Sequence, residues 1–325
     1  MARSNSALAG IVIAALLGTY ATAAAAQGQS RPIRLVVPLA PGGTNDTLAR
    51  IVSERMGERL GQAVVVDNRP GANAQIGSAI VARATPDGNT LLMIGAGHAT
   101  NPSLIKQLPY DTQRDFAPVG MVAGGPYIVV IYPGVPAKTA KEFAAWVRSR
   151  PGQVSYGSAG AGSPTHLAGE LFKIAAGGLD MQHVPYKGGS ALMPDLLSGR
   201  IAMNVTSPAT GAVHLNAGRL RAIGVTTATR VPQFPEIPTF IESGFPDFQV
   251  NAWYGMLTTG RTPQARVNRL STALQQSLAD AQTREQIEKQ GLTVEASSAE
   301  QFAHIIRTDT VKWAKVVKAA GIEPE

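Results

Sequence analysis

The sequence predicts an α/β protein built from two lobes that the chain joins by two crossings, and three observations support this. Short apolar runs alternate with segments whose apolar residues recur at helical spacing, an order typical of parallel sheets covered by helices. Two strand-like runs flanked by glycine and proline separate one self-contained α/β stretch from the rest of the chain. The 325 residues, 44% hydrophobic and 16% charged, are enough for two such units.

The first 26 residues are interpreted as a cleavable signal peptide. Arg3 precedes an apolar stretch over residues 7–17, and three alanines at 24–26 form a small-residue cleavage pattern before Gln27. The apolar stretch is too short to span a bilayer, which disfavours a membrane anchor. The sequence has no cysteine, which excludes lipid attachment through an N-terminal Cys and also excludes disulfides and thiolate metal sites. We therefore expect an exported protein that is not a lipoprotein.

Nine apolar runs are expected to form strands, and helical periodicity lies between many of them. Apolar residues recur at helical spacing over residues 48–60, 143–147 and 167–174. The expected strands are 33–38, 63–68, 90–95, 117–123, 127–132, 154–158, 201–206, 220–226 and 251–257.

The chain is expected to pass between the lobes at residues 124–136 and again at 231–255. Each stretch holds a strand beside glycine and proline, and two strands that join two lobes make a natural hinge. The expected division gives lobe 1 residues 27–126 and 252–325, and lobe 2 residues 127–251. The helical tail over residues 263–320 is expected to pack on lobe 1.

The glycine turn PGGTND at residues 41–46 links a strand to a helix and could hold an anion. Its glycines let backbone N–H groups approach a ligand, and a helix start carries unpaired N–H groups with a partial positive charge. Thr44 or Asn45 is expected to cap the helix, and Asp46 to fix the loop by accepting from its N–H groups. A plain strand-to-helix connection would have the same sequence, so this motif alone leaves the question open.

A second loop, residues 158–162, has the same design. It follows a strand, has almost no side-chain bulk, and leads to Ser163 and Pro164 at the expected N-cap and first helical position. Facing each other across a cleft, the two loops would offer two helix starts to two anionic ends of one small molecule. His98, in a third loop, could bond a carboxylate or be a structural histidine.

Other functional classes lack support in the sequence. The net charge of +7 is scattered and aromatics make up 6%, which disfavours a nucleic-acid surface. No dinucleotide, P-loop, nucleophile-elbow or zinc-protease motif occurs, so no cofactor, metal or catalytic residue is expected. His166 and Glu170, one helical turn apart, are interpreted as a surface pair. An exported hydrolase stays open because spatial triads are not visible in a sequence.

Nine stretches in order along the chain carry a family resemblance. They are IRLVVPLAPGGTND, VVVDNRPGA, DGNTLLMIG, NPSLIKQLPYD, FAPVGMVA, SYGSAGAGSPTHLAGELF, HVPYKGG, GRLRAIGVTT and KWAKVVKAAGI. In these the sequence resembles the Bug family, the periplasmic solute receptors of tripartite tricarboxylate transporters. The resemblance implies a type II-like periplasmic-binding-protein fold that closes on a small carboxylate (a di- or tricarboxylate, an amino acid or an aromatic acid) and delivers it to a membrane permease, as a monomer.

The resemblance also implies a ligand site made largely of backbone groups. Ser207 is included because it lies near the position where the family usually has an acid and this chain has Ala202. The implied ligand-binding residues are Pro41, Gly42, Gly43, Asp46, His98, Ser158, Ala159, Gly160, Gly162, Ser163, His166 and Ser207. A ligand sensor that contacts a signalling receptor is the alternative to a transport role.

Overall fold

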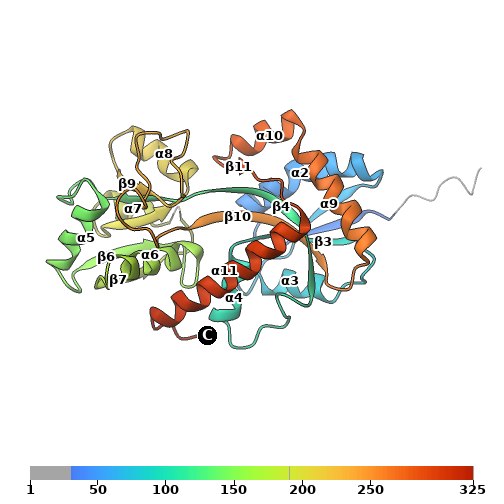
Figure 1. The fold of residues 1–325 in the computed structure, drawn as a ribbon, viewed down its shortest axis with the longest axis horizontal. Coiled ribbons are helices and arrows are strands. Elements are labelled where there is room, and N and C mark those ends of the chain that lie inside the picture. The colour runs from blue at the N-terminus through green and yellow to red at the C-terminus, as the bar shows by residue number, and fades with distance from the viewer. Residues whose placement is uncertain (1–30, 190, 325) are drawn as a thin grey trace, which may run out of the picture.

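The computed structural model describes residues 31–324 except residue 190, and it folds into two lobes (Figure 1). The predicted signal peptide over residues 1–26 lies outside the described residues. Each lobe has its own sheet covered by helices, as the alternation of apolar runs and helical segments predicts. None of the helices within the described residues combines the length and the apolar character needed to cross a membrane.

The sheet of lobe 1 has six strands in the order β11-β4-β10-β3-β1-β2. Strands β1, β2 and β3 run parallel, and β10 runs antiparallel to both β3 and β4. Its strands are β1 (Ile33–Val37), β2 (Val64–Asn68), β3 (Thr90–Gly95), β4 (Phe116–Pro126), β10 (Asn251–Thr259) and β11 (Thr293–Val294). Its helices are α2 (Thr44–Leu60), α3 (Gln75–Ala82), α4 (Gly97–Leu104), α9 (Gln264–Leu278) and α10 (Ala281–Glu288).

The sheet of lobe 2 has five strands in the order β7-β6-β8-β5-β9. This repeats the arrangement of lobe 1: the first three parallel strands stand in the order second, first, third, and an antiparallel strand follows them. Its strands are β5 (Ile128–Ile131), β6 (Val154–Ser158), β7 (Met181–Pro185), β8 (Met203–Thr206) and β9 (Arg221–Val225). Its helices are α5 (Ala140–Arg148), α6 (Pro164–Ala175), α7 (Met193–Leu197) and α8 (Pro208–Asn216).

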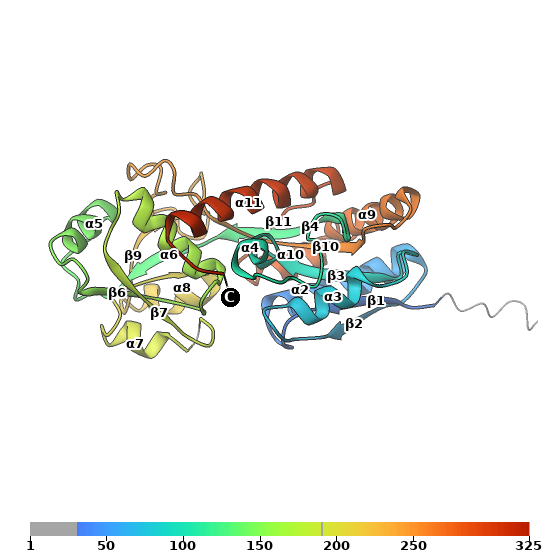
Figure 2. The same ribbon diagram turned by 90° about the horizontal axis from the view of Figure 1, so that it is seen from below.

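Two extended segments connect the lobes, as predicted. The chain leaves the first sheet at the end of β4, passes Tyr127 and enters β5, and it returns by way of β10 (Figures 1 and 2). The residue boundaries chosen for the lobes stay a prediction.

The C-terminal helix α11 (Ala299–Ala319) packs on lobe 1, as was expected of the tail, and it also contacts lobe 2. It packs on α4 and β4 and also on α6 of the other lobe (Figure 2). Its 21 residues span about 31 Å, which is long enough to bridge both lobes. Asp309 on α11 also accepts a hydrogen bond from the Trp253 indole of β10 at 2.6 Å. The helix therefore lies beside both the hinge and the two lobes.

Three elements differ from the expectation. Strand β7 was missed because its sequence, MQHVP, is too polar and short to show a strand pattern. Strand β11 has only two residues. Helix α4 forms where a loop was expected, and it contains Pro102. It packs on α11, and its residues His98, Ala99 and Asn101 are buried; such tertiary packing can stabilise a helix that contains a proline.

Candidate functional site

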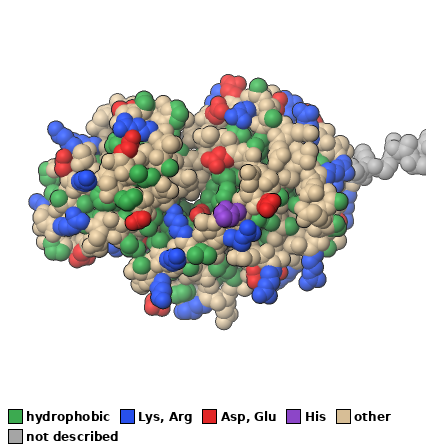
Figure 3. Space-filling view, viewed as in Figure 1, with side chains coloured by type: hydrophobic (Ala, Val, Ile, Leu, Met, Phe, Trp, Pro, Cys, Tyr) green, Lys and Arg blue, Asp and Glu red, His purple; other side chains and the backbone are tan. Residues whose placement is uncertain are grey.

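A cavity of about 500 Å³ lies between the lobes, and the loops after β1, β3 and β6 contribute to its wall. The turn between β2 and α3, the two crossing segments and the end of the chain complete the wall. The helices α2, α3, α4 and α6 all begin at this cavity. The two lobes are visible as separate masses with a hollow between them, and acidic and basic side chains are interspersed on the face shown (Figure 3). No Lys or Arg is among the described residues that line the cavity.

The start of α2 leaves several N–H groups free at the cavity. Its N-cap is Gly43, which has no side chain to accept from them, so the expectation that Thr44 or Asn45 caps this helix is wrong. The helix begins one residue earlier, which places both residues in its first turn, where they line the cavity. Among the described residues no acceptor bonds the N–H groups of Thr44, Asn45 and Asp46. These groups carry the positive end of the helix dipole.

Asp46 fixes the turn ahead of α2, as predicted. Its Oδ2 accepts from the Gly42 N–H at 2.9 Å, and its Oδ1 lies 3.0 Å from Nη2 of Arg50. The hydrogen bond from Arg50 lowers the pKa of this carboxyl below its usual value, assisted by the Gly42 N–H and opposed by burial. Gly42 has a φ of +81°, a conformation that favours glycine. Asp46 therefore remains ionised and holds the turn.

The other two lobe 1 helices at the cavity also lack a side-chain cap. Helix α3 follows Ala74 and helix α4 follows Ala96, and neither alanine has a side chain that can accept a hydrogen bond from the helix start. Ala72, Asn73 and Ala74 have φ values of 45°, 49° and 70°, so three successive non-glycine residues adopt a left-handed conformation at the cavity edge. Such conformations cost about 1–3 kcal/mol each and cluster at ligand sites.

Helices α6 and α8 of lobe 2 differ, because a serine caps each of them. Ser163 accepts from the His166 N–H at the start of α6, with Pro164 at the first position, as predicted. Ser207 accepts from the Thr210 N–H at the start of α8. The three lobe 1 helices that begin at the cavity therefore lack a side-chain cap, whereas α6 of lobe 2 has one.

Most backbone N–H groups of the β6–α6 loop are bonded within the loop. The N–H of Ala159 donates to Thr165 Oγ1 at 3.0 Å, that of Gly160 to Ser158 Oγ at 3.1 Å, and that of Gly162 to His166 Nδ1 at 3.0 Å. The Ser163 N–H donates to the Gly160 carbonyl. Within residues 159–163, all of them described, Ala161 alone keeps an unbonded N–H, and it lines the cavity.

The structure places six of the twelve predicted residues on the cavity wall and six off it. Those on the wall are His98, Ala159, Gly160, Gly162, Ser163 and His166. Those off the wall are Pro41, Gly42, Gly43, Asp46, Ser158 and Ser207. A ligand contact by any of them stays a prediction.

His98 is a buried, neutral ring. Its Nε2 donates to the Thr112 carbonyl at 3.2 Å, and its ring contacts Phe116 edge-on with centroids 5.1 Å apart. Burial lowers its pKa to about 4, so it carries no charge at neutral pH. Of the two roles considered for His98, the geometry favours the structural one, in which it orients the start of α4.

Sequence reasoning missed the residues that shape the middle of the cavity. Tyr127 comes from one crossing, and Trp253 and Tyr254 come from the other. The aromatic content of NAWYG within a predicted hinge was the available signal. The leucines and isoleucines of the wall are Leu39, Ile94, Leu104, Ile105 and Ile322.

Comparison with known proteins gives one family. The chain matches the family described as "Tripartite tricarboxylate transporter family receptor" over residues 48–322. It is also 32% identical over 317 residues to the protein BugT of Bordetella pertussis, a match that covers 97% of each chain.

Solved structures of similar fold include three with 29–35% sequence identity. The periplasmic binding protein BugD has a TM-score of 0.76 at 35% identity, covering 91% of this chain and 99% of that one. Rpa4515 of R. palustris, solved with adipate, has a TM-score of 0.79 at 31% identity, covering 92% and 100%. MatC of Rhodopseudomonas palustris, with bound malate, has a TM-score of 0.75 at 29% identity, covering 89% and 99%. The predicted periplasmic-binding-protein fold is thereby confirmed.

Proposed function

Because the chain belongs to the Bug family of tripartite tricarboxylate transporter receptors, we propose that it binds a small carboxylate between its lobes and delivers it to a membrane permease. One observation carries the binding part: three uncapped helix starts of lobe 1 line a single cavity. The proposal assigns the chain a binding role and no reaction. It places the mature protein in the periplasm after removal of residues 1–26.

The carboxylate group is proposed to bind at the start of α2. The free N–H groups of Thr44 and Asn45, which line the cavity, can donate to its oxygens, and the dipole of a 17-residue helix favours a negative charge there. Hydrogen bonds to a charged group contribute about 1.5–3 kcal/mol each, which explains how a site without Lys or Arg can hold an anion. The Ala161 N–H and the hydroxyl of Thr165 would contact the ligand from lobe 2.

The body of the ligand is proposed to be mainly apolar. Leu39, Leu104 and Trp253 stand on the wall between the two loop regions, and apolar groups bind well to such walls. Adipate, found with one structural neighbour, has four methylene groups between its carboxylates, whereas malate, found with another, carries a hydroxyl. An aliphatic dicarboxylate or an aromatic acid suits this cavity better than a tricarboxylate such as citrate, whose three charges would meet no Lys or Arg.

The test is a thermal-shift panel on the mature protein with adipate, malate, benzoate, citrate and glucose. We expect adipate or benzoate to raise the melting temperature, because a ligand that binds only the folded state stabilises it by mass action. Citrate is expected to give a smaller shift. A shift from glucose with none from any acid would contradict the carboxylate assignment. A shift from citrate alone would agree with a carboxylate ligand but contradict the proposal that the body of the ligand is mainly apolar.

A further inference from the structure

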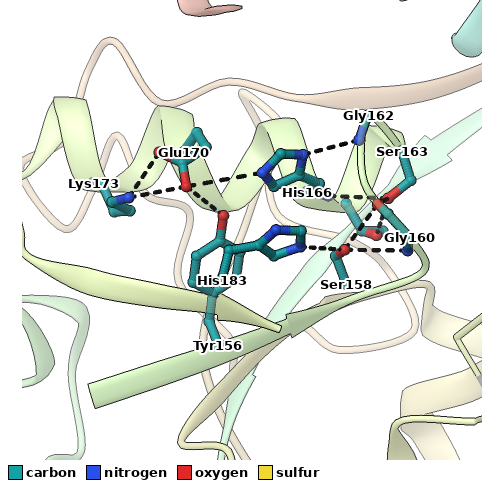
Figure 4. Close-up of polar contacts among 10 residues, drawn as sticks. Tyr156, Ser158, Gly160, Gly162, Ser163, His166, Glu170, Lys173 and His183 are labelled. Atoms are coloured by element: carbon teal, nitrogen blue, oxygen red, sulfur yellow. Dashed lines mark hydrogen bonds and ion pairs between the residues drawn. The ribbon is translucent and has the colours of Figure 1, made fainter. Parts of the chain in front are cut away.

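A chain of polar side chains lies directly behind the β6–α6 loop (Figure 4). It joins Ser158 on β6 and His183 on β7 to His166 and Glu170 on α6. His166 and Glu170 are 6% and 5% exposed, so their interpretation as a surface pair is wrong. The network is part of the protein interior, where each polar group needs a partner.

Ser158 is fully buried and holds Gly160 at both of its backbone groups. Its Oγ donates to the Gly160 carbonyl at 2.9 Å and accepts from the Gly160 N–H at 3.1 Å. Its third contact is with Nε2 of His183 at 2.7 Å. With the single hydroxyl proton directed to the carbonyl, His183 donates to Ser158 from Nε2. The same burial and contacts leave Ser158 without the access that a nucleophile needs.

His166 holds the other side of the loop. Its Nδ1 accepts from the Gly162 N–H at 3.0 Å, so the ring proton is on Nε2, which faces Oε1 of Glu170 at 4.0 Å. The His166 and His183 rings stack with centroids 3.7 Å apart and an interplanar angle of 15°. The two stacked rings thus fix Gly160 and Gly162, which flank the one loop residue with a free N–H.

We propose that His183, acting through Ser158 and stacked on His166, is a positioning residue that sets the β6–α6 loop in its ligand-binding conformation. The proposal rests on the binding function above for its effect on affinity. Its effect on the loop does not depend on any ligand. The positioning role requires both imidazole rings to be neutral. A protonated Nδ1 of His166 could not accept from the Gly162 N–H, and two protonated rings stacked face to face would repel each other.

The surroundings keep both rings neutral. Burial is the main cause that lowers the pKa of His183, to about 4, with His166 and Lys173 adding to it. Burial is also the main cause that lowers the pKa of His166. The charge of Glu170 raises this pKa, and the charge of Lys173 lowers it further. Tyr156 completes the set of titratable groups and donates to Glu170 at 2.5 Å. The loop is therefore fixed above pH 6.5 and should loosen as the pH falls towards 4.

The test compares two substitutions of one residue. His183→Phe keeps a stacked ring but cannot donate to Ser158, whereas His183→Gln can still donate from its amide. Amide exchange of Gly160 and Gly162 is measured in the ligand-free protein, together with the affinity for adipate or for whichever panel acid raises the melting temperature most. We expect His183→Phe to speed amide exchange of Gly160 and Gly162 and to weaken acid binding, each about tenfold, which is the effect of losing roughly one hydrogen bond. We expect His183→Gln to keep most of the wild-type protection and most of the wild-type affinity.

His304→Phe is the matched control, because His304 lies exposed on α11, and it should leave exchange and affinity unchanged. Exchange and affinity within twofold of wild type in His183→Phe would overturn the proposal, as would equal losses in the Phe and Gln variants. Exchange is compared between pH values as a protection factor, the intrinsic exchange rate at each pH divided by the observed rate. Protection of Gly160 and Gly162 that does not fall between pH 6.5 and pH 4.5 would overturn the requirement for neutral rings. If wild type binds no acid, the proposed function fails, and the exchange data still decide the positioning role.

Discussion

At the scale of single residues, the polar groups around the cavity act mainly on the backbone. Asp46 bonds Gly42, Ser158 bonds Gly160, and His166 bonds Gly162. Each side chain fixes a glycine of a loop, and glycine loses the most conformational freedom on folding. The side chains behind the wall thus reduce the entropy that the loops would otherwise lose when a ligand binds.

Asp46 gives a prediction with a defined pH dependence. Asp46→Ala should lower the melting temperature at pH 7, because it removes the acceptor of Gly42 and the partner of Arg50. The folded-state pKa of Asp46 lies below 3.8. Its stabilising contribution is therefore complete above that value and is lost as the pH falls through the lower folded pKa.

Thermal unfolding at pH 7 and pH 2.5 measures this effect. The difference between wild type and Asp46→Ala should be clear at pH 7 and smaller at pH 2.5. Glu54→Ala, an exposed acid on the same helix, is the control and should change little at either pH. A difference that persists unchanged at pH 2.5 would show that the ionised carboxylate is not the stabilising species.

At the scale of elements, α6 depends on close packing over β6. Gly169 lies on the buried face of α6, and a Cβ there would stand 2.2 Å from a ring carbon of Tyr156. Gly169→Ala should destabilise the protein by about 1–3 kcal/mol through overpacking, offset by up to about 1 kcal/mol of helix propensity. It should also weaken ligand binding, because α6 carries His166.

Denaturant unfolding gives the free energies for this comparison. Gly57→Ala is the matched control, since Gly57 also lies within a helix and the nearest atom to its added Cβ is at 3.4 Å. That variant should be neutral or more stable than wild type. An equal change in the free energy of unfolding of the two variants would mean that the close contact with Tyr156 does not prevent a larger residue at position 169.

The sequence allowed the elements to be predicted better than the site. Apolar runs marked nine strands and the crossings, because burial in a sheet requires such runs. The stack of His166 and His183 could not be predicted, because His183 lies on β7, which has no clear strand pattern, and the pairing of β6 with β7 brings the rings together. The start of α2 was misplaced by one residue, which was enough to hide its missing cap.

At the scale of the whole molecule, closure of the lobes must involve β10 and α11. Trp253 lines the cavity, lies on a crossing strand and donates to Asp309 on α11. The helix in turn contacts α4 and α6 on opposite sides of the hinge. A ligand that contacts both lobes would favour the closed form, and Trp253 would report the change because it lines the cavity and its indole contacts α11 beside the hinge.

Tryptophan fluorescence can test this coupling. The sequence has three tryptophans, of which Trp146 lies on α5 away from the cavity and Trp313 is buried in α11. We expect adipate, or the panel acid with the largest thermal shift, to change the emission of wild type and of Trp146→Phe. Trp253→Phe should lose the change while its melting temperature still rises with the acid. An emission change that survives in Trp253→Phe would place the moving contact elsewhere, with Trp313 on α11 as the next residue to replace.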